Sequence, residues 1–204
     1  MKKADRRQIY WDTACWLAWL QDERFWPIDV IAGLEDVVSA AEAGTIVLFT
    51  SITTRGEIFL GSLDQDQKDK WAKLMRRSNV QEINSDARIF DRAAAIREWH
   101  HNRDQRVQLP DALHLATAIL YRADEFQTLD GLEKEGRKLK GLLALSGDVQ
   151  GYNLKIVHPY PLDRPSPELV TITGPLFEQS DASPDPKVTT KGKPRRKSKA
   201  ADSK

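Results

Sequence analysis

Short strand-like runs alternate with longer helical patterns along most of the chain, and this alternation constrains the fold more than any other feature. Apolar and β-branched runs predict strands at residues 8–11, 45–50, 80–83, 126–129 and 154–157. Helical patterns lie between them, at residues 13–21, 27–43, 52–62, 65–77, 86–103 and 110–122. Strands that alternate with helices form a parallel sheet covered by helices on both faces. The sequence therefore predicts a three-layer α/β/α fold with a central parallel sheet.

The composition changes near residue 160, where we expect the folded domain to end. Seven of the ten prolines lie beyond that point, together with many Ser, Asp and Lys residues. Such a composition cannot bury enough apolar surface to offset the entropy of folding. We predict a single domain over residues 1–160 and a linker with a disordered tail over residues 161–204. Whether the alternating segment 169–173 forms a short strand stays open.

The tail is basic although the whole chain is nearly neutral. The formal net charge is +1, and residues 187–204 contain eight Lys or Arg residues and one acid, a balance of +7. The remainder therefore carries +1 minus +7, or −6. A basic tail on an acidic domain favours binding to polyanions such as RNA. A terminus that only improves solubility is the alternative, and the sequence does not choose between them.

Cysteine content and hydropathy exclude several classes of protein. The single cysteine, Cys15, can form neither an internal disulfide nor a cysteine-based zinc site. A catalytic metal would therefore need oxygen or histidine ligands, and the reducing cytosol is the expected compartment. The N-terminus shows no apolar stretch of signal-peptide length, and no apolar run approaches the roughly 20 residues of a membrane span. We expect a cytoplasmic protein outside the membrane.

Four acidic residues follow predicted strands or begin predicted helices. Asp12 comes directly after the first strand, and Glu57 lies about one turn into the helix after the second. Asp111 follows Pro110 at the start of a helix, and Asp130 ends the fourth strand. Ligands of parallel α/β sheets gather at the carboxyl ends of the strands. All four acids therefore map to one edge of the predicted sheet.

Each of these acids, taken alone, also fits a structural role. Asp12 and Asp111 could start helices, Asp130 could form a turn, and Glu57 could be a solvated helix residue. Together, however, clustered carboxylates repel one another unless a cation lies between them. Hard oxygen ligands are those that Mg²⁺ and Mn²⁺ prefer, and such sites perform in-line hydrolysis of phosphodiesters.

Four short strings carry these acids: Ile-Tyr-Trp-Asp-Thr at residues 9–13, the segment at residues 51–59, Pro-Asp-Ala-Leu-His-Leu-Ala-Thr-Ala at residues 110–118, and Thr-Leu-Asp at residues 128–130. In this order they resemble PIN domains, especially the VapC-type toxins of bacterial toxin-antitoxin pairs, over about residues 8–160. The third string is the most specific of the four.

The resemblance implies a ribonuclease and names its site. It implies an Mg²⁺- or Mn²⁺-dependent endoribonuclease, an antitoxin protein as partner and, in many members, a homodimer. The metal ligands that it implies are Asp12, Glu57, Asp111 and Asp130. Thr13 and Thr128 match positions where small hydroxyl residues assist the site. Gly56 departs from the family pattern, in which a larger residue precedes the glutamate, and the basic tail lies outside it.

Two other functions stay open at this stage. A PIN nuclease that processes RNA without being a toxin would carry the same acids. A catalytically idle module that binds nucleic acid or a protein partner would draw its affinity from the tail. The retention of all four acids argues against the idle module, because an unused site is free to lose them.

Several conspicuous residues are interpreted as structural. His114 lies in an apolar helix, where a satisfied core histidine is the common case. His100 and His101 are adjacent on a helix, point about 100° apart and are expected at the surface. Cys15 is expected to be a buried thiol of raised pKa. We interpret four tryptophans as packing residues: Trp16, Trp19, Trp71 and Trp99.

Overall fold

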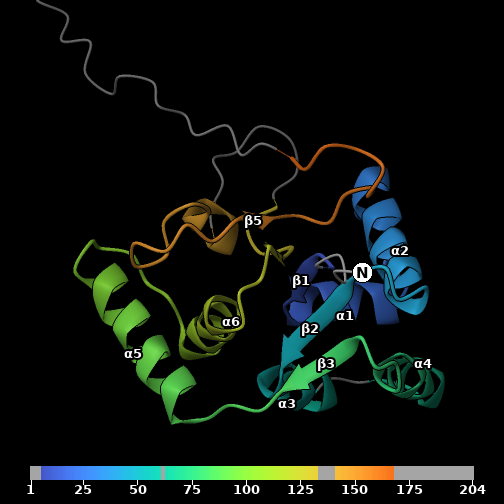
Figure 1. Cartoon of the computed structure of the whole chain (residues 1–204), viewed down its shortest axis with the longest axis horizontal. Coiled ribbons are helices and arrows are strands. Elements are labelled where there is room, and N and C mark those ends of the chain that lie inside the picture. The colour runs from blue at the N-terminus through green and yellow to red at the C-terminus, as the bar shows by residue number, and fades with distance from the viewer. Residues whose placement is uncertain (1–5, 61–62, 133–140, 168–204) are drawn as a thin grey trace, which may run out of the picture. The chain divides into compact units, whose positions relative to one another are not determined.

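The structure is a computed structural model that describes residues 6–60, 63–132 and 141–167 (Figure 1). The elements follow in the order β1 (Gln8–Trp11), α1 (Thr13–Leu20), α2 (Ile28–Glu42), β2 (Val47–Ser51), α3 (Ile52–Leu60), α4 (Gln65–Met75), β3 (Val80–Ile83), α5 (Ala87–His101), α6 (Leu109–Leu120), β4 (Glu125–Gln127), the 3-10 helix η1 (Gly141–Leu145) and β5 (Ile156–Val157). Every predicted strand and helix is present, with ends shifted by a few residues. The 3-10 helix η1 was not predicted.

The five strands form one sheet in the order β3-β2-β1-β4-β5, and each neighbouring pair is parallel. β1 is the central strand, where Tyr10 pairs with Phe49 of β2 on one side and with Phe126 of β4 on the other. Because all strands run the same way, their carboxyl ends share one edge. The predicted parallel sheet is confirmed.

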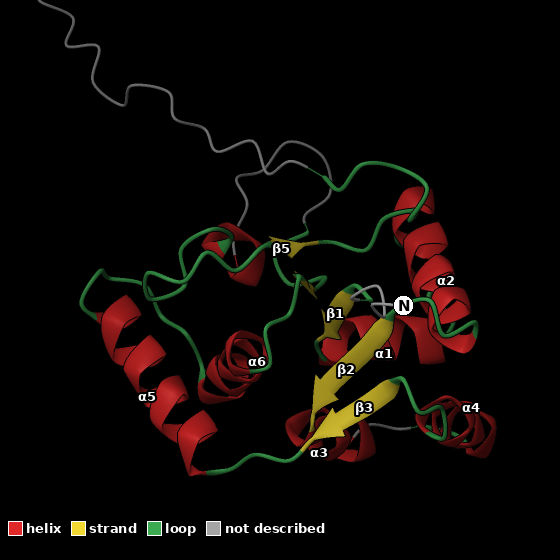
Figure 2. Cartoon of the chain, in the orientation of Figure 1, coloured by secondary structure: helices red, strands yellow, loops and turns green. Residues whose placement is uncertain are grey.

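Side chains of β1 alternate between the two faces of the sheet. Ile9 and Trp11 belong to a core cluster shared with α1, α2 and α4, whereas Tyr10 belongs to a cluster shared with α5 and α6. Figure 2 shows α5 and α6 on one side of the strands and α2 and α4 on the other. The sheet is therefore the middle layer of three, as predicted.

Aromatic packing anchors α1 against the first of these clusters. Trp16 is fully buried and makes edge contacts with Trp11 and Trp71, with ring centroids 5.1 and 4.6 Å apart. Cys15 is also fully buried, and burial raises the pKa of its thiol well above the usual value, as predicted.

Within the described ranges, no helix is both long enough and apolar enough to cross a membrane.

The chain after β5 packs along α2. A Cβ at Gly33 of α2 would lie 2.1 Å from the backbone nitrogen of Tyr160, so only glycine permits this approach. Beyond it, the backbone N–H of Leu162 donates to Asp36, and Arg164 pairs with Asp29 at 3.0 Å. These residues of the predicted linker thus contact the domain. The rest of the predicted tail, residues 168–204, lies outside the described residues.

At the amino end of the sheet, a buried carboxylate is fully paired. Glu125 of β4 is 2% exposed and contacts Arg7 at 2.6 Å and Lys155 at 2.9 Å. The hydroxyl of Tyr160 donates to it as well, at 2.9 Å. Burial alone would raise the pKa of Glu125, but the hydrogen bonds from Lys155 and Arg7 outweigh it and lower the pKa below its usual value. This acid therefore stabilises the fold in its charged form.

We predict that Glu125→Gln lowers the free energy of unfolding by about 2 to 3 kcal/mol at pH 7, because it leaves two cations without their buried partner. A lowered pKa in the folded state contributes stability above the unfolded pKa of about 4.3, and this stability is lost as the pH falls below it. Urea unfolding between pH 7 and pH 3 should therefore show the variant and the wild type converging at low pH. Glu35→Gln, which breaks an exposed pair with Arg24, is the control and should cost less than about 1 kcal/mol. Equal costs for both variants would contradict the prediction.

Candidate functional site

The strand order places a crevice at the carboxyl ends of β1 and β4. The chain runs from β1 outward through β2 and β3, and then returns to add β4 and β5 on the other side of β1. A sheet of this kind leaves an opening where the order reverses, and ligands bind there. Asp12 follows β1 directly, and Thr128 follows β4 directly. The fold thus brings these two predicted site residues to the position that the sequence pattern indicated.

Asp12 is buried, and each of its carboxylate oxygens accepts a hydrogen bond. Its Oδ1 accepts from the backbone N–H of Cys15 at 3.1 Å, so Asp12 caps the start of α1. Its Oδ2 accepts from the hydroxyl of Thr128. Burial raises the pKa of Asp12 to about 6, against the opposing effects of Thr128 and His114. Asp12 can therefore cap α1 and also act as the predicted metal ligand, because each carboxylate oxygen has a second lone pair.

Glu57 lies on α3 and turns toward the start of α1. Its Oε2 accepts a hydrogen bond from the hydroxyl of Thr13 and lies 3.2 Å from Nε2 of His114. Half-burial raises its pKa, but the hydrogen bonds from His114 and Thr13 reverse this and hold it below the usual value. A Cβ added at Gly56 would meet nothing within 4 Å. The glycine at position 56 is thus not required by packing around Glu57.

His114 connects Glu57 to the core of the sheet. It is 3% exposed, and its Nδ1 lies 2.6 Å from the hydroxyl of Tyr10. The backbone N–H of Ser51 donates to that hydroxyl oxygen at 3.1 Å, so the hydroxyl proton is left for His114 Nδ1. The hydrogen on Nε2 of His114 then faces Glu57.

His114 is a core residue, as predicted, and it also contacts the predicted site residues Thr13 and Glu57. The available sequence signal was its spacing, because it lies one helical turn after Asp111. What the sequence could not supply was the contact with Tyr10, because this contact depends on which face of β1 packs against α6.

Asp111 and Asp130 form the other half of the site. Asp111 lies in the first turn of α6, after Pro110. Its pKa is raised by burial and then by the charge of Asp130. The Oδ2 of Asp130 accepts from the backbone N–H of Leu142 at 2.9 Å, at the start of η1. A Cβ at Gly141, whose φ is +64°, would lie 2.5 Å from this carboxylate, so glycine at 141 allows η1 to hold Asp130.

Asp111 and Asp130 line one cavity of about 520 Å³, together with the loop before α6 and with η1. Asp12 and Glu57 are tied instead to hydroxyl groups, those of Thr128 and Thr13. The two halves are adjacent: Thr128 also accepts from the backbone N–H of Asp130 at 2.9 Å, and the charge of Glu57 raises the pKa of Asp111. All six predicted site residues therefore lie in one region. Hydrogen bonds join Asp12, Thr128 and Asp130 in one group and Thr13 and Glu57 in another, and Asp111 shares a cavity with Asp130.

The donor chemistry of this region fits a divalent cation. Three of the four acids are at least partly buried, and the mutual repulsion of Asp111 and Asp130 is the signature of a site that gains from a positive ion. In the described part of the chain, no three Asp, Glu, His or Cys side chains converge closely enough to enclose an ion. The four acids thus supply the carboxylate oxygens that Mg²⁺ or Mn²⁺ prefers. In the structure, Asp12, Glu57 and Asp130 accept hydrogen bonds from the protein itself.

The sequence matches the PIN domain family over residues 9–131. This match covers more than half of the chain and includes all six site residues. The chain therefore belongs to the PIN domain family, whose members are in general nucleases.

Three solved structures are similar to this chain. A chain of VapBC2 from Rickettsia felis, bound to a promoter DNA fragment, is 13% identical with a TM-score of 0.52, over 74% of this chain and 98% of that one. A chain of a toxin-antitoxin complex from Klebsiella pneumoniae is 25% identical with a TM-score of 0.44, over 72% and 99%. A chain of FitAcB from Neisseria gonorrhoeae is 18% identical with a TM-score of 0.44, over 60% and 87%. No curated protein matches the sequence.

We predict that Asp12 makes the metal-free protein less stable as the pH rises. Its folded pKa of about 6 exceeds the unfolded value of about 3.9, so the stability that the protonated form provides is lost between these two values. Between pH 4.5 and 7.5 in EDTA, the wild type should lose on the order of 2 kcal/mol relative to Asp12→Asn, as measured by urea unfolding.

The matched control for this experiment is Asp64→Asn. Asp64 caps α4 with the same kind of hydrogen bond, to the backbone N–H of Gln67 at 2.8 Å, but it is exposed. This variant should track the wild type at every pH. A parallel response of Asp12→Asn and the wild type would show that burial does not perturb Asp12.

Proposed function

We propose that this PIN domain is a metal-dependent endoribonuclease and the toxin of a toxin-antitoxin pair. The observation that carries the proposal is the placement of Asp111 and Asp130 in one cavity, beside the buried Asp12, at the point where the strand order of a PIN-family sheet reverses. Repelling carboxylates in such a crevice favour a divalent cation and, with it, a phosphate group.

Each site residue has a physical role in this proposal. Asp12, Glu57, Asp111 and Asp130 hold Mg²⁺ or Mn²⁺ through carboxylate oxygens. When bound, the ion lowers the pKa of its water and neutralises charge on the reacting phosphate. Thr128 fixes one oxygen of Asp12, and Thr13 fixes one oxygen of Glu57, so that neither carboxylate rotates freely.

The burial of Asp12 argues against the idle binding module. Capping a helix needs only a Ser, Thr or Asn side chain, which would avoid the cost of a buried charge. No described Lys or Arg pairs with Asp12, and its raised pKa records that cost. A charge kept in this position is explained by a bound cation. Both a toxin and an RNA-processing nuclease satisfy this argument.

An antitoxin is the partner that we propose, and the likeness of fold to a chain of VapBC2 motivates it. A second copy of this chain is a further proposed partner. An open reading frame for a small DNA-binding protein directly upstream would favour the toxin over the RNA-processing nuclease.

We predict that Asp12→Asn and Asp111→Asn each reduce RNA cleavage by roughly a hundredfold or more, because each removes a charged ligand from the metal that aligns water and phosphate. The assay follows cleavage of a fluorescently quenched single-stranded RNA of mixed sequence in Mg²⁺ and, separately, in Mn²⁺. The control is Asp64→Asn, which removes one exposed negative charge at the start of α4, outside the six site residues, and should cleave like the wild type. Near-wild-type rates in both site variants, with the fold intact by circular dichroism, would overturn the nuclease assignment.

We predict that an antitoxin inhibits by placing an arginine or lysine among these acids, because a cationic side chain offsets the same repulsion as the metal. Asp111→Asn and Asp130→Asn should then weaken the complex with the co-expressed antitoxin and reduce the dependence of its affinity on salt. Isothermal titration of the purified partners measures both quantities. Unchanged affinity in both variants would place the antitoxin away from the acids.

A further inference from the structure

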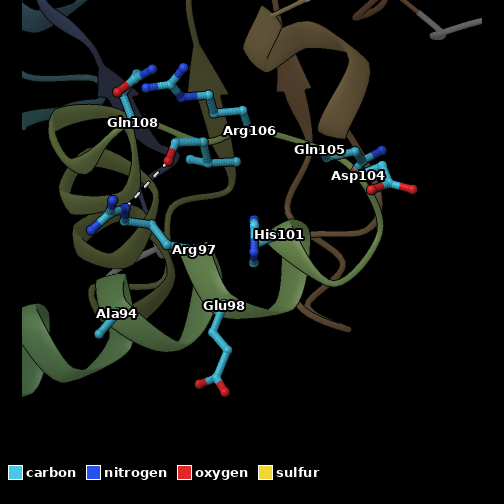
Figure 3. A pocket seen from close by; sticks show the side chains of 9 residues that line it. Ala94, Arg97, Glu98, His101, Asp104, Gln105, Arg106 and Gln108 are labelled. Carbon is cyan, nitrogen blue, oxygen red and sulfur yellow. Dashed lines mark hydrogen bonds between the residues drawn. The ribbon is translucent and has the colours of Figure 1, made fainter.

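A second cavity, of about 680 Å³, lies where α5 ends and the loop to α6 begins. Figure 3 shows Arg97, His101 and Arg106 around it, with the amides of Gln105 and Gln108 nearby. None of the six predicted site residues lines this cavity.

The second cavity adjoins the cavity of Asp111 and Asp130 through a shared wall. Residues 104–107 of the loop line both cavities, and α6 with Asp111 begins two residues later. The two cavities therefore lie next to each other, on either side of this loop.

The charge balance changes across this wall. The first cavity is lined by three acids and one arginine: Asp104, Asp111, Asp130 and Arg106. In the second, Arg97 and Arg106 balance Glu98 and Asp104, and Figure 3 shows Glu98 directed away from Arg106. Neither Arg97 nor Arg106 forms an ion pair within residues 6–60, 63–132 and 141–167. Their charge is available to a ligand.

The loop that carries Arg106 is fixed by a buried histidine. His100 was expected at the surface, but it is 1% exposed, and its Nδ1 lies 2.6 Å from Oε1 of Gln105. The backbone N–H of Gln105 donates to the carbonyl of His100 at 3.0 Å, and Asp104 turns the chain with a φ of +55°. Arg97 adds a bond from Nε to the carbonyl of Val107 at 3.4 Å. These contacts hold the wall between the cavities in place.

We propose that the second cavity binds the RNA backbone next to the scissile phosphate, with Arg97 and Arg106 as the phosphate contacts. This inference rests on the proposed function. In an RNA strand whose scissile phosphate lies at the metal-bound acids, the neighbouring phosphates must lie outside the acidic region. Inside it, acids that no metal compensates would repel them. The cavity beyond the loop offers guanidinium groups, which bind phosphate with paired N–H donors. An acidic protein segment is the rival occupant, and the experiment separates the two.

The experiment measures RNA binding by full-length Arg97→Gln/Arg106→Gln. Fluorescence anisotropy with a labelled 12-nucleotide oligouridine, in EDTA so that no metal-dependent cleavage occurs, gives the affinity over a range of salt concentrations. Affinity should fall roughly three- to tenfold near physiological salt, and the log-log salt slope should decrease by about 1.4, or 0.7 for each lost phosphate contact. The same variant should raise the KM for RNA cleavage more than it lowers kcat.

The matched control is Arg88→Gln/Arg92→Gln. These two arginines also lie on α5 and line a cavity, of about 460 Å³, that shares no residue with the acidic one. The control removes the same total charge, from α5 alone, so it should change RNA binding clearly less than the test variant. Equal losses in both variants would reduce the effect to net charge and overturn the proposal.

Position along the RNA is tested with a neutral linkage. Once the cleavage site is mapped, two RNAs are made, each with a single methylphosphonate next to the cut, on one side or on the other. The wild type should cleave one of these two RNAs more slowly than the unmodified RNA. Arg97→Gln/Arg106→Gln should be insensitive to that same substitution. The subsite is overturned if the variant binds RNA like the wild type and loses only antitoxin binding, which would indicate the acidic protein segment. If the wild type binds RNA through these arginines but cleaves none, the nuclease proposal fails and the binding site stands.

Discussion

The central position of β1 is the constraint on which the rest of the structure depends. It pairs in parallel with β2 and with β4, so both of its edges and both of its faces are buried. The pairing with β4 continues past the strand, where the backbone N–H of Asp12 donates to the carbonyl of Gln127 at 3.3 Å. Below it, the Trp11 indole N–H donates to the Gln127 side chain at 2.8 Å. This register brings Asp12 within hydrogen-bond distance of Thr128, at the edge of the sheet where the acids lie.

Two buried acids at opposite ends of this sheet show what separates a structural carboxylate from a candidate ligand. Glu125 has Arg7, Lys155 and Tyr160 as partners, and the hydrogen bonds from the two cations lower its pKa despite burial. Asp12 has only a hydroxyl and a backbone N–H, and burial raises its pKa to about 6. Cationic side chains thus pair with Glu125, whose charge stabilises the fold, whereas no Lys or Arg among the described residues pairs with Asp12. A buried charge left without a cation is expected where a ligand provides one.

The strand and helix pattern was predictable because each element has the length and periodicity of its class. The positions of Asp12 and Asp130 were predictable because both come after strands, and that of Asp111 because it begins a helix after Pro110. The features that the sequence did not reveal arise from tertiary contacts. The 3-10 helix η1 follows a region without periodicity and holds Asp130 through Gly141, whose role depends on a clash visible only in three dimensions. His100 looks like a surface residue beside His101, yet the turn at Asp104 and the contact with Gln105 bury it. Helical position alone does not give the burial of a helix end.

The short segment between α5 and α6 links the acids to their surroundings. It forms the wall of both cavities, and it enters α6 through Pro110, which fixes the direction in which Asp111 emerges. A displacement of this segment would therefore move the proposed metal ligand and the arginines together. His114, one turn further along the same helix, reaches Tyr10 of β1 and Glu57 of α3. Through His114, α6 thus joins α3 to the central strand, so the positions of Glu57 and Asp111 relative to β1 follow from the packing of α6 on the sheet.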